Sequence, residues 1–314
     1  MSSTDIPKIS FKKLLDNDSS VNNQLSYALE SHGFFEIIDH DISRDSLDKS
    51  YYLAAKFFNL SHEIKNKYSH PEFGGARGYT QYGKETALGE TTPDQKEFWH
   101  HGPDIDASYD SRIHRNIVVN ELSDFNDHFN EVFKSLNNLG MKILSSIART
   151  LTLNENFFDD WVSKGNSILR LIHYPPIESE NFLRARPHED INLITLLVGA
   201  KEPGLELKSK DNEWIPIQSD HEGIICNIGD MMQLVTRNQL KSTTHRVIHY
   251  DDGTNTSRYS MPFFLHPAPN VMLKSIVNDC KDEVLAHDFL EERVKAIKLY
   301  YCLLYTSPSP RDRS

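Results

Sequence analysis

Residues 188–197 read HEDINLITLL, and residues 242–247 read STTHRV. In the first stretch His188 and Asp190 are separated by one residue, so an extended backbone would point both side chains to one face while Glu189 points away. The second stretch adds the imidazole of His245. Two histidines and one carboxylate on a shared face can bind one metal ion and leave three positions open, which suits non-haem Fe(II). Zinc, which favours closed or nearly closed tetrahedral sets, is the alternative metal.

A second pair of same-face residues follows in the sequence Arg258-Tyr259-Ser260. Here the alternation of an extended chain places a guanidinium beside a hydroxyl. Arginine binds carboxylates through two parallel charge-assisted hydrogen bonds, and a serine can add a third. A dicarboxylate that binds the metal at one end would present its other carboxylate to this pair. The spacing therefore predicts a dicarboxylate cosubstrate beside the metal.

Short apolar runs surround these motifs and are separated by turn signals such as Pro175-Pro176 and Asp251-Asp252-Gly253. The runs span residues 168–174, 191–197, 205–207, 214–217, 223–228, 232–235, 245–249 and 258–265. About eight short strands at close spacing predict a sandwich or barrel, and eight is the strand count of a jelly roll. We therefore expect a mostly β protein with supporting helices (α+β) and a jelly-roll core.

The remaining segments have a mixed texture. Ser43 is a candidate N-cap for a helix that runs through Phe58, and apolar residues recur at helical spacing from Leu122 to Leu151. Residues 34–38 and 96–101 suggest strands, residues 73–89 an aromatic loop, and residues 285–300 a last helix. We expect one compact body divided into residues 1–120, a scaffold helix region 121–163, the jelly roll 164–270 and a C-terminal helix 271–301.

Composition limits the partners and the compartment. The 314 residues carry 45 acidic and 34 basic side chains, a formal net charge of -11, which disfavours nucleic acid. No apolar run approaches the roughly 18 residues of a membrane span, and the N-terminus lacks a signal-peptide pattern. Three cysteines at wide spacing, Cys226, Cys280 and Cys302, form neither a disulfide framework nor a zinc pattern. We expect a cytoplasmic monomer that acts on a small molecule.

The last thirteen residues, CLLYTSPSPRDRS (302–314), differ in sequence pattern from the helix that precedes them. The string resembles an in-frame translation of a sequencing adaptor, and the helical apolar period stops where it begins. Such a segment carries no information about the fold. The natural chain is expected to end near Tyr301.

The sequence as a whole resembles the isopenicillin N synthase-like family of Fe(II)/2-oxoglutarate oxygenases, in particular its bacterial members. The resemblance runs from Ile6 to about Tyr301. It is carried by GFF (33–35), ARGYT (76–80), KEFWHHG (96–102), HYPP (173–176), HEDINLITLL (188–197), NIGDMMQ (227–233), STTHRV (242–247) and SRYSMPFFLHP (257–267).

The resemblance implies a double-stranded β-helix, which is a jelly roll, supported by helices. It implies an oxidoreductase that uses Fe(II), 2-oxoglutarate and dioxygen to oxidise a small organic substrate, releasing succinate and CO2. The implied iron ligands are His188, Asp190 and His245. The implied 2-oxoglutarate contacts are Arg258, Ser260 and Tyr174.

Two features depart from the pattern of the family. Ile172 stands where many plant members have a cosubstrate-binding asparagine, and the 12 residues between His245 and Arg258 make a slightly longer connection than usual in eukaryotic members. Isopenicillin N synthase itself shares the Arg-x-Ser motif yet uses no 2-oxoglutarate. An oxidase independent of 2-oxoglutarate is therefore one alternative, and a non-catalytic jelly-roll binding protein is another. An ethylene/succinate-forming enzyme is a third alternative. Some bacterial relatives of that kind carry a G-x-E stretch that resembles Gly83-Lys84-Glu85 of this sequence.

The substrate pocket is expected where the aromatic loop, the adjoining strand and the last core strand meet. The candidates are Arg77, Tyr79, Glu85, His100 and Phe264. Glu85 would suit an amino or guanidino group on the substrate, or it is simply a solvated loop charge.

Overall fold

The computed structural model describes residues 6–87, 90–106, 109–176, 183–198, 203–217, 223–249, 255–277 and 282–297. The predicted turn at residues 251–253, two of the cysteines and the segment 302–314 lie outside these ranges. Within them, Cys226 is a buried free thiol. No helix in the described ranges combines the length and the apolar character that crossing a membrane requires.

The larger of the two main sheets has eight strands in the order β1-β2-β10-β7-β12-β5-β4-β3. All its neighbours are antiparallel except β1 and β2. The strands are β1 (Lys8–Ser10), β2 (Phe34–Ile38), β3 (Gly78–Thr80), β4 (Glu97–His101), β5 (Ile168–Tyr174), β7 (Ile194–Val198), β10 (Ile224–Ile228) and β12 (Arg258–Leu265).

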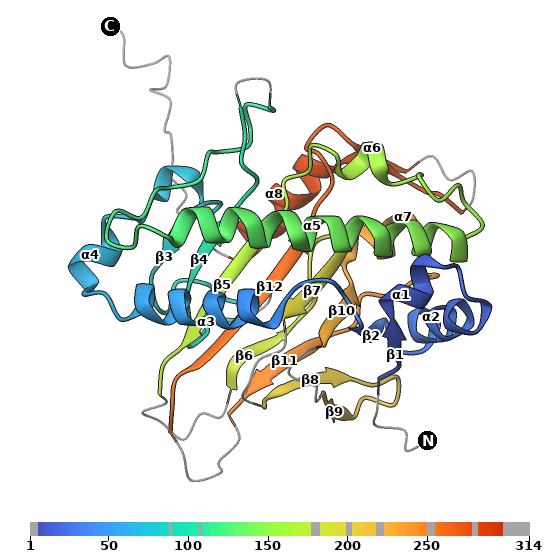
Figure 1. Cartoon of the computed structure of the whole chain (residues 1–314), viewed down its shortest axis with the longest axis horizontal. Coiled ribbons are helices and arrows are strands. Elements are labelled where there is room, and N and C mark those ends of the chain that lie inside the picture. The colour runs from blue at the N-terminus through green and yellow to red at the C-terminus, as the bar shows by residue number, and fades with distance from the viewer. Residues whose placement is uncertain are drawn as a thin grey trace, which may run out of the picture.

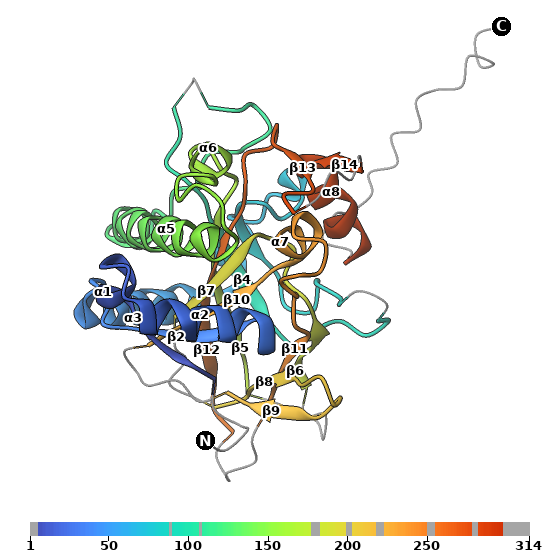
Figure 2. The same cartoon turned by 90° about the vertical axis from the view of Figure 1, so that its right-hand side faces the viewer.

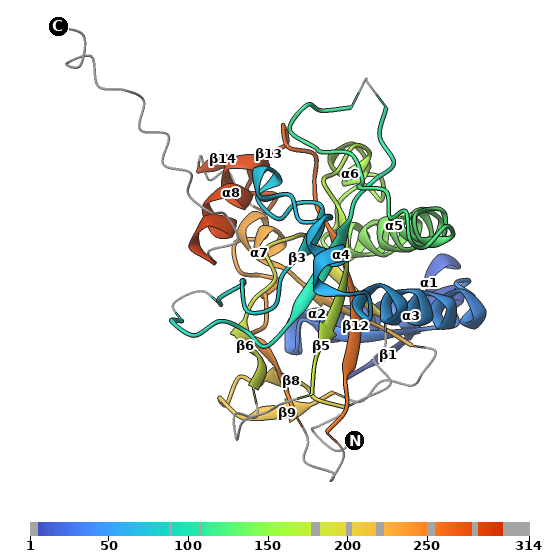
Figure 3. The same cartoon turned by 90° about the vertical axis from the view of Figure 1, so that its left-hand side faces the viewer.

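The smaller sheet has four strands in the order β6-β11-β8-β9. They are β6 (Leu183–His188), β8 (Leu205–Lys208), β9 (Trp214–Pro216) and β11 (His245–Ile248). Figures 2 and 3 show this sheet on the side of the large sheet that faces away from the long helices. Together with β5, β7, β10 and β12 it forms an eight-stranded jelly roll. The predicted fold class is thereby confirmed.

Helices cover the outer face of the large sheet, where α5 (Phe125–Thr150) and α3 (Arg44–Phe58) run side by side in front of the strands (Figure 1). The apolar stripe predicted along α5 is buried, and Phe133 meets Phe263 of β12 at a centroid separation of 5.1 Å. Ser43 caps α3 as predicted, accepting a hydrogen bond from the amide of Ser46.

Shorter elements complete the body. Two helices near the N-terminus, α1 (Phe11–Leu15) and α2 (Ser19–Ser31), lie beside β1 and β2, and the small pair β13 (Met272–Lys274) and β14 (Glu283–Leu285) lies near α8 (Ala286–Ala296) (Figure 2). The remaining short helices are α4 (His62–Asn66), η1 (Pro71–Phe73), α6 (Asp159–Val162) and α7 (Asp230–Val235).

Two predictions about the core strands were wrong. The run at residues 232–235 is not a strand but part of α7, a short helix that begins after Gly229. A short apolar run does not distinguish a strand from a helical turn by itself. Conversely β6, whose sequence is LRARPH, was missed because two arginines and a proline do not resemble a buried strand. The strand count of eight was right only because these two errors cancel.

The alternation of side chains along each strand positions the site. On β12, Phe263 and Leu265 point to the helices and belong to the main apolar core. Ser260, Pro262 and Phe264 point the other way, into a cavity between the two sheets.

Candidate active site

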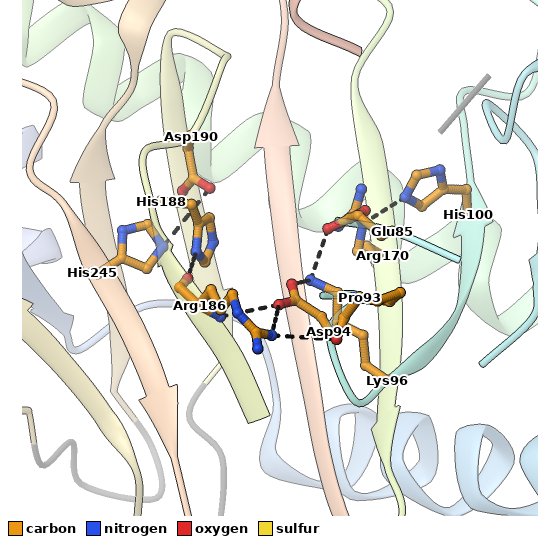
Figure 4. Close-up of polar contacts among 10 residues, drawn as sticks. All are labelled: Glu85, Pro93, Asp94, Lys96, His100, Arg170, Arg186, His188, Asp190 and His245. Atoms are coloured by element: carbon orange, nitrogen blue, oxygen red, sulfur yellow. Dashed lines mark hydrogen bonds and ion pairs between the residues drawn. The ribbon is translucent and has the colours of Figure 1, made fainter. Parts of the chain in front are cut away.

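Three side chains meet at the end of the small sheet where β6 ends and β11 begins. One ligand atom of each of His188, Asp190 and His245 lies within 4.8 Å of those of the other two. His188 ends β6 and pairs across the ladder with His245, the first residue of β11. Asp190 lies two residues beyond the end of β6, in the connection to β7, so the predicted extended run does not continue through it. Figure 4 shows the three groups converging.

Hydrogen bonds orient both histidines. Nδ1 of His188 lies 2.7 Å from the carbonyl oxygen of Arg186, and Nδ1 of His245 lies 3.2 Å from that of Thr243. A carbonyl can only accept, so each Nδ1 carries the proton and each Nε2 keeps its lone pair for a metal. Burial, with His245 as a second cause, lowers the pKa of His188 to about 4. The ring is therefore neutral and able to bind a cation at neutral pH.

The two carboxylate oxygens of Asp190 have different surroundings. Its Oδ2 accepts hydrogen bonds from Thr195 at 2.6 Å and from Asn227 at 2.9 Å, while Oδ1 faces Nε2 of His245 at 3.8 Å. Burial alone would raise the pKa of Asp190, but the two histidines and these hydrogen bonds outweigh it and lower the pKa below its usual value. One oxygen is thus fixed by the protein, and the other is left for a metal.

The loop that carries Asp190 is tied to the start of α7. The amide of Asp230 donates to the carbonyl of Asp190 over 2.7 Å, and the amide of Gly229 donates to Leu193 over 3.0 Å. A Cβ at Gly229 would lie 2.2 Å from the carbonyl oxygen of Asn192, so only glycine allows this close approach. The stretch NIGD (227–230) therefore holds the loop that carries Asp190 in place.

A cavity of about 430 Å³ opens beside the three groups and continues between the sheets. Ser260 and Tyr174 line it, and the guanidinium of Arg258 lies 5.4 Å from the ring centroid of Tyr174. Arg258 is only 2% exposed, yet its Nε and Nη1 have no hydrogen-bond partner among the described residues. A buried guanidinium without a partner is costly, which indicates a place for an anionic ligand.

The donor set fits iron and the orphaned arginine fits a dicarboxylate, and comparison with known proteins agrees with this reading. Residues 165–267 match the model of the 2OG-Fe(II) oxygenase superfamily, and residues 6–121 match the non-haem dioxygenase N-terminal region named for morphine synthesis. A proline hydroxylase of Petromyces alliaceus is 30% identical over 266 residues, which cover 79% of this chain and 82% of the relative. The chain belongs to the 2OG-Fe(II) oxygenase superfamily.

Solved structures agree with this assignment. A 2OG-Fe(II) oxygenase family protein of Caulobacter crescentus superimposes with a TM-score of 0.86 at 36% identity, covering 94% of this chain and all of that one. A Neurospora crassa protein solved in complex with α-ketoglutarate and thymine superimposes with a TM-score of 0.83 at 25% identity, covering 94% of this chain and 98% of the Neurospora chain. The predicted enzyme class is confirmed: the protein is a dioxygenase that uses Fe(II), 2-oxoglutarate and dioxygen.

The oxygenase brings three of the five predicted substrate residues to its cavity. Glu85, His100 and Phe264 line it. Arg77 does not; it is buried, and its guanidinium donates to the carbonyl of His114 and to the side chain of Asn166.

Tyr79 does not line the cavity either. It pairs with Trp99 across β3 and β4 on the face that the helices cover, and its hydroxyl donates to Glu97, which also binds Lys65. An aperiodic loop offered no signal for choosing the face on which these two side chains lie.

A row of buried charges in the cavity wall was not predicted. Lys96 lies 2.7 Å from Glu85 and 3.0 Å from Asp94, and Arg170 binds Glu85 at 3.0 Å (Figure 4). Arg170 precedes Tyr174 by four residues on β5, so strand alternation counted back from Tyr174 would have placed it on the cavity side.

Proposed function

We propose that His188, Asp190 and His245 are the iron ligands of this dioxygenase and that Arg258, Ser260 and Tyr174 hold 2-oxoglutarate. The observation that carries the proposal is the coincidence of two features along one cavity. Three ligand atoms that line it lie within 4.8 Å of one another, and a buried guanidinium next to the lining residue Tyr174 lacks an anionic partner among the described residues. Neither feature is explained by packing alone.

The side chains prepare the site in complementary ways. The two histidines turn their Nε2 atoms toward the site, and Asp190 supplies one carboxylate oxygen, so an open face remains for further ligands. Arg258 and Ser260 would bind the distal carboxylate of the cosubstrate and so fix its orientation. Bound iron, 2-oxoglutarate and dioxygen would together supply a two-electron oxidation of the substrate, with succinate and CO2 as co-products.

The substrate is a small organic molecule in this proposal. The names of similar proteins point to different compounds, since one relative is a proline hydroxylase and the Neurospora crassa protein was solved with thymine. The same cavity of about 430 Å³ must also accommodate 2-oxoglutarate, which leaves room only for a compact substrate. The net charge of -11 supports the proposal that the protein does not bind nucleic acid. We further propose that it acts as a cytoplasmic monomer.

Anaerobic calorimetry with Fe(II), followed by 2-oxoglutarate, tests this function. The wild-type protein should bind one equivalent of each, and should release succinate when air is admitted. His188→Ala, Asp190→Ala and His245→Ala should each lose iron and succinate release while keeping their far-ultraviolet circular dichroism. His62→Ala, at an exposed position on α4, is the control and should behave as wild type.

Two results would contradict the proposal. Full activity of any of the three ligand variants at stoichiometric iron would show that the ligand set is misassigned. Oxidation of a substrate at full rate without 2-oxoglutarate would favour the oxidase alternative.

A further inference from the structure

Arg170 occupies a distinctive position in the cavity wall. Its guanidinium lies over the ring of Phe98, 4.3 Å from the centroid, and 5.2 Å from that of Phe264. Its side chain is 13% exposed and lines the cavity. Figure 4 shows Arg170 on the side of the view away from the proposed iron ligands.

Two of the three guanidinium nitrogens of Arg170 are already fixed by the protein. Nε donates to Nε2 of His100 over 2.6 Å, and Nη1 donates to Glu85 over 3.2 Å. His100 can accept because its Nδ1 faces the carbonyl of Gly75 at 2.6 Å and because burial holds its pKa well below the usual value. Nη2 has no hydrogen-bond partner among the described residues, so the guanidinium is rigid but not saturated.

The charge of Arg170 is shared along a row of buried side chains. Arg170, Glu85, Lys96, Asp94 and Arg186 form a row of alternating sign, with Nη1 of Arg186 3.8 Å from Asp94. This row holds three cations and two carboxylates. Buried charges are stable only when they are paired, so the third cation needs an anion outside these five residues.

The two ends of the row differ in how they can acquire that anion. At the Arg186 end, a carboxylate oxygen of Glu90 lies 3.4 Å away, and Glu90 is 46% exposed, so water and a surface carboxylate share the charge. At the other end, the single carboxylate that Arg170 contacts among the described residues is Glu85, which is shared with Lys96. Glu90 therefore balances the row in number, but only from its exposed end. At the cavity, Arg170 shares its one described carboxylate with Lys96, and its Nη2 remains open to a further anion.

Glu85 itself is not available to a cationic substrate. Burial would raise its pKa, but the charges of Arg170 and Lys96 outweigh burial and hold the pKa far below its usual value. Glu85 is thus an internal counter-ion, and its Oε2 is closed off from solvent. Of the two alternatives that the sequence left for Glu85, a solvated loop charge is wrong because the side chain is buried, and recognition of an amino or guanidino group is disfavoured because the carboxylate is already paired.

We propose that the substrate of this oxygenase is a small organic acid whose carboxylate binds Arg170 and whose carbon skeleton rests on Phe264. The inference rests on the proposed function, because it assumes that Arg258 is occupied by 2-oxoglutarate and leaves Arg170 for the substrate. The fixed guanidinium loses little freedom when it binds an acceptor. Its positive charge favours a carboxylate over a neutral carbonyl compound.

The test compares small monocarboxylic acids with their primary amides, which have nearly the same shape and no charge. Each compound, and thymine as a neutral ring, is titrated calorimetrically into the anaerobic protein with Fe(II) and 2-oxoglutarate, and succinate release is then measured in air. We expect at least one acid to bind and to stimulate succinate release. Its amide should bind about 30-fold more weakly or worse, as expected for loss of a partly buried charge pair.

Variants locate the effect at Arg170. Arg170→Gln should weaken binding of that acid by about 30-fold or more and leave binding of its amide unchanged, and Arg170→Lys should lie between because it keeps the charge but not the fork. Arg112→Gln is the matched control. Arg112 also lines the cavity, but Asp110 already binds its guanidinium at 2.9 and 2.5 Å, so acid binding should persist.

Several outcomes would overturn the inference. They are a panel in which no acid binds, amides or thymine that bind as tightly as the acids, and equal losses in Arg112→Gln and Arg170→Gln. If 2-oxoglutarate itself neither binds nor yields succinate, the proposed function fails. If 2-oxoglutarate is turned over but acids are not preferred, only the role of Arg170 is refuted.

Discussion

The hydroxyl of Thr195 lies 2.6 Å from Oδ2 of Asp190 and accepts a hydrogen bond from Asn192 at 2.9 Å. Because the Thr195 oxygen already accepts a hydrogen bond from Asn192, the hydroxyl proton of Thr195 is donated to Asp190. Asn227, the partner of Thr195 across β7 and β10, donates to the same oxygen. Two neighbouring strands thus hold one oxygen of the proposed iron ligand and leave the other free.

Removing these donors should weaken iron binding while leaving the three ligands in place. Thr195→Val keeps the shape and deletes the hydroxyl, so the iron dissociation constant should rise about 10- to 100-fold. Asn227→Asp should do more harm, since it replaces a donor with a second buried carboxylate. Competition with a chelator measures the constant. Thr150→Val, whose hydroxyl donates to the carbonyl of Ser146 in its own helix, should match wild type; wild-type iron affinity in Thr195→Val would show that Asp190 needs no such support.

Arg258 should govern the affinity for 2-oxoglutarate. Arg258→Gln should raise the KM for 2-oxoglutarate much more than that for the substrate, by about 30-fold to several thousandfold, the equivalent of about 2–5 kcal/mol for one partner of a buried pair. Arg258→Lys should rescue part of the loss. Ser260→Ala should cost about 1 kcal/mol, because it deletes one hydrogen bond among several. Unchanged dependence on 2-oxoglutarate in Arg258→Gln would exclude this arginine as the anchor.

Lys96 should be essential for stability. It is buried and lies 2.7 Å from Glu85 and 3.0 Å from Asp94, and these two neighbours hold its pKa above the usual value against the effect of burial. Lys96→Met would remove the cation that lies between the buried carboxylates of Glu85 and Asp94, so the free energy of unfolding should fall by about 3–5 kcal/mol. Lys134→Met, which breaks only an exposed pair with Glu131, should cost under about 1 kcal/mol. Urea denaturation of both variants measures the two changes in the free energy of unfolding. Equal decreases in the two variants would refute the role of burial.

The clustering of His188, Asp190 and His245 and the shared face of Arg258 and Ser260 were predicted from strand alternation. For Arg258 and Ser260 on β12 the alternation holds, whereas Asp190 reaches the cluster from the loop after β6 and not from an extended strand. The jelly roll followed from the count of apolar runs, although that count was correct through two compensating errors.

The charged wall of the cavity could not be predicted in the same way. A lysine, two arginines and two carboxylates scattered from Glu85 to Arg186 resemble solvated surface residues, and each is tolerated inside only because the others neutralise it. That pairing exists only in the folded protein. The face on which Tyr79 lies was also a tertiary outcome, since its register opposite Trp99 decides it.

Acid should destabilise the metal-free protein through its buried histidines. Burial lowers the pKa of both His101 and His266 to about 4, against about 6.5 in the unfolded chain. The unfolded chain therefore binds protons more tightly, so the contribution to stability is complete above about pH 6.5 and is lost as the pH falls toward 4. Each histidine should cost about 2 kcal/mol of unfolding free energy between pH 7 and pH 5.

His101→Gln isolates one of these contributions. Glutamine does not titrate, and it can keep a hydrogen bond to Asn130, which lies 2.8 Å from His101 Nε2. Urea denaturation in the presence of a chelator should show a loss between pH 7 and pH 5 that is smaller than in wild type by about 2 kcal/mol. Asn130→Ala is the matched control, because it deletes the hydrogen bond but keeps the titrating ring, so it should lower stability at neutral pH and retain the acid-induced loss. If His101→Gln instead follows the wild-type profile, His101 is already protonated in the folded protein at pH 5, and the acid sensitivity arises elsewhere.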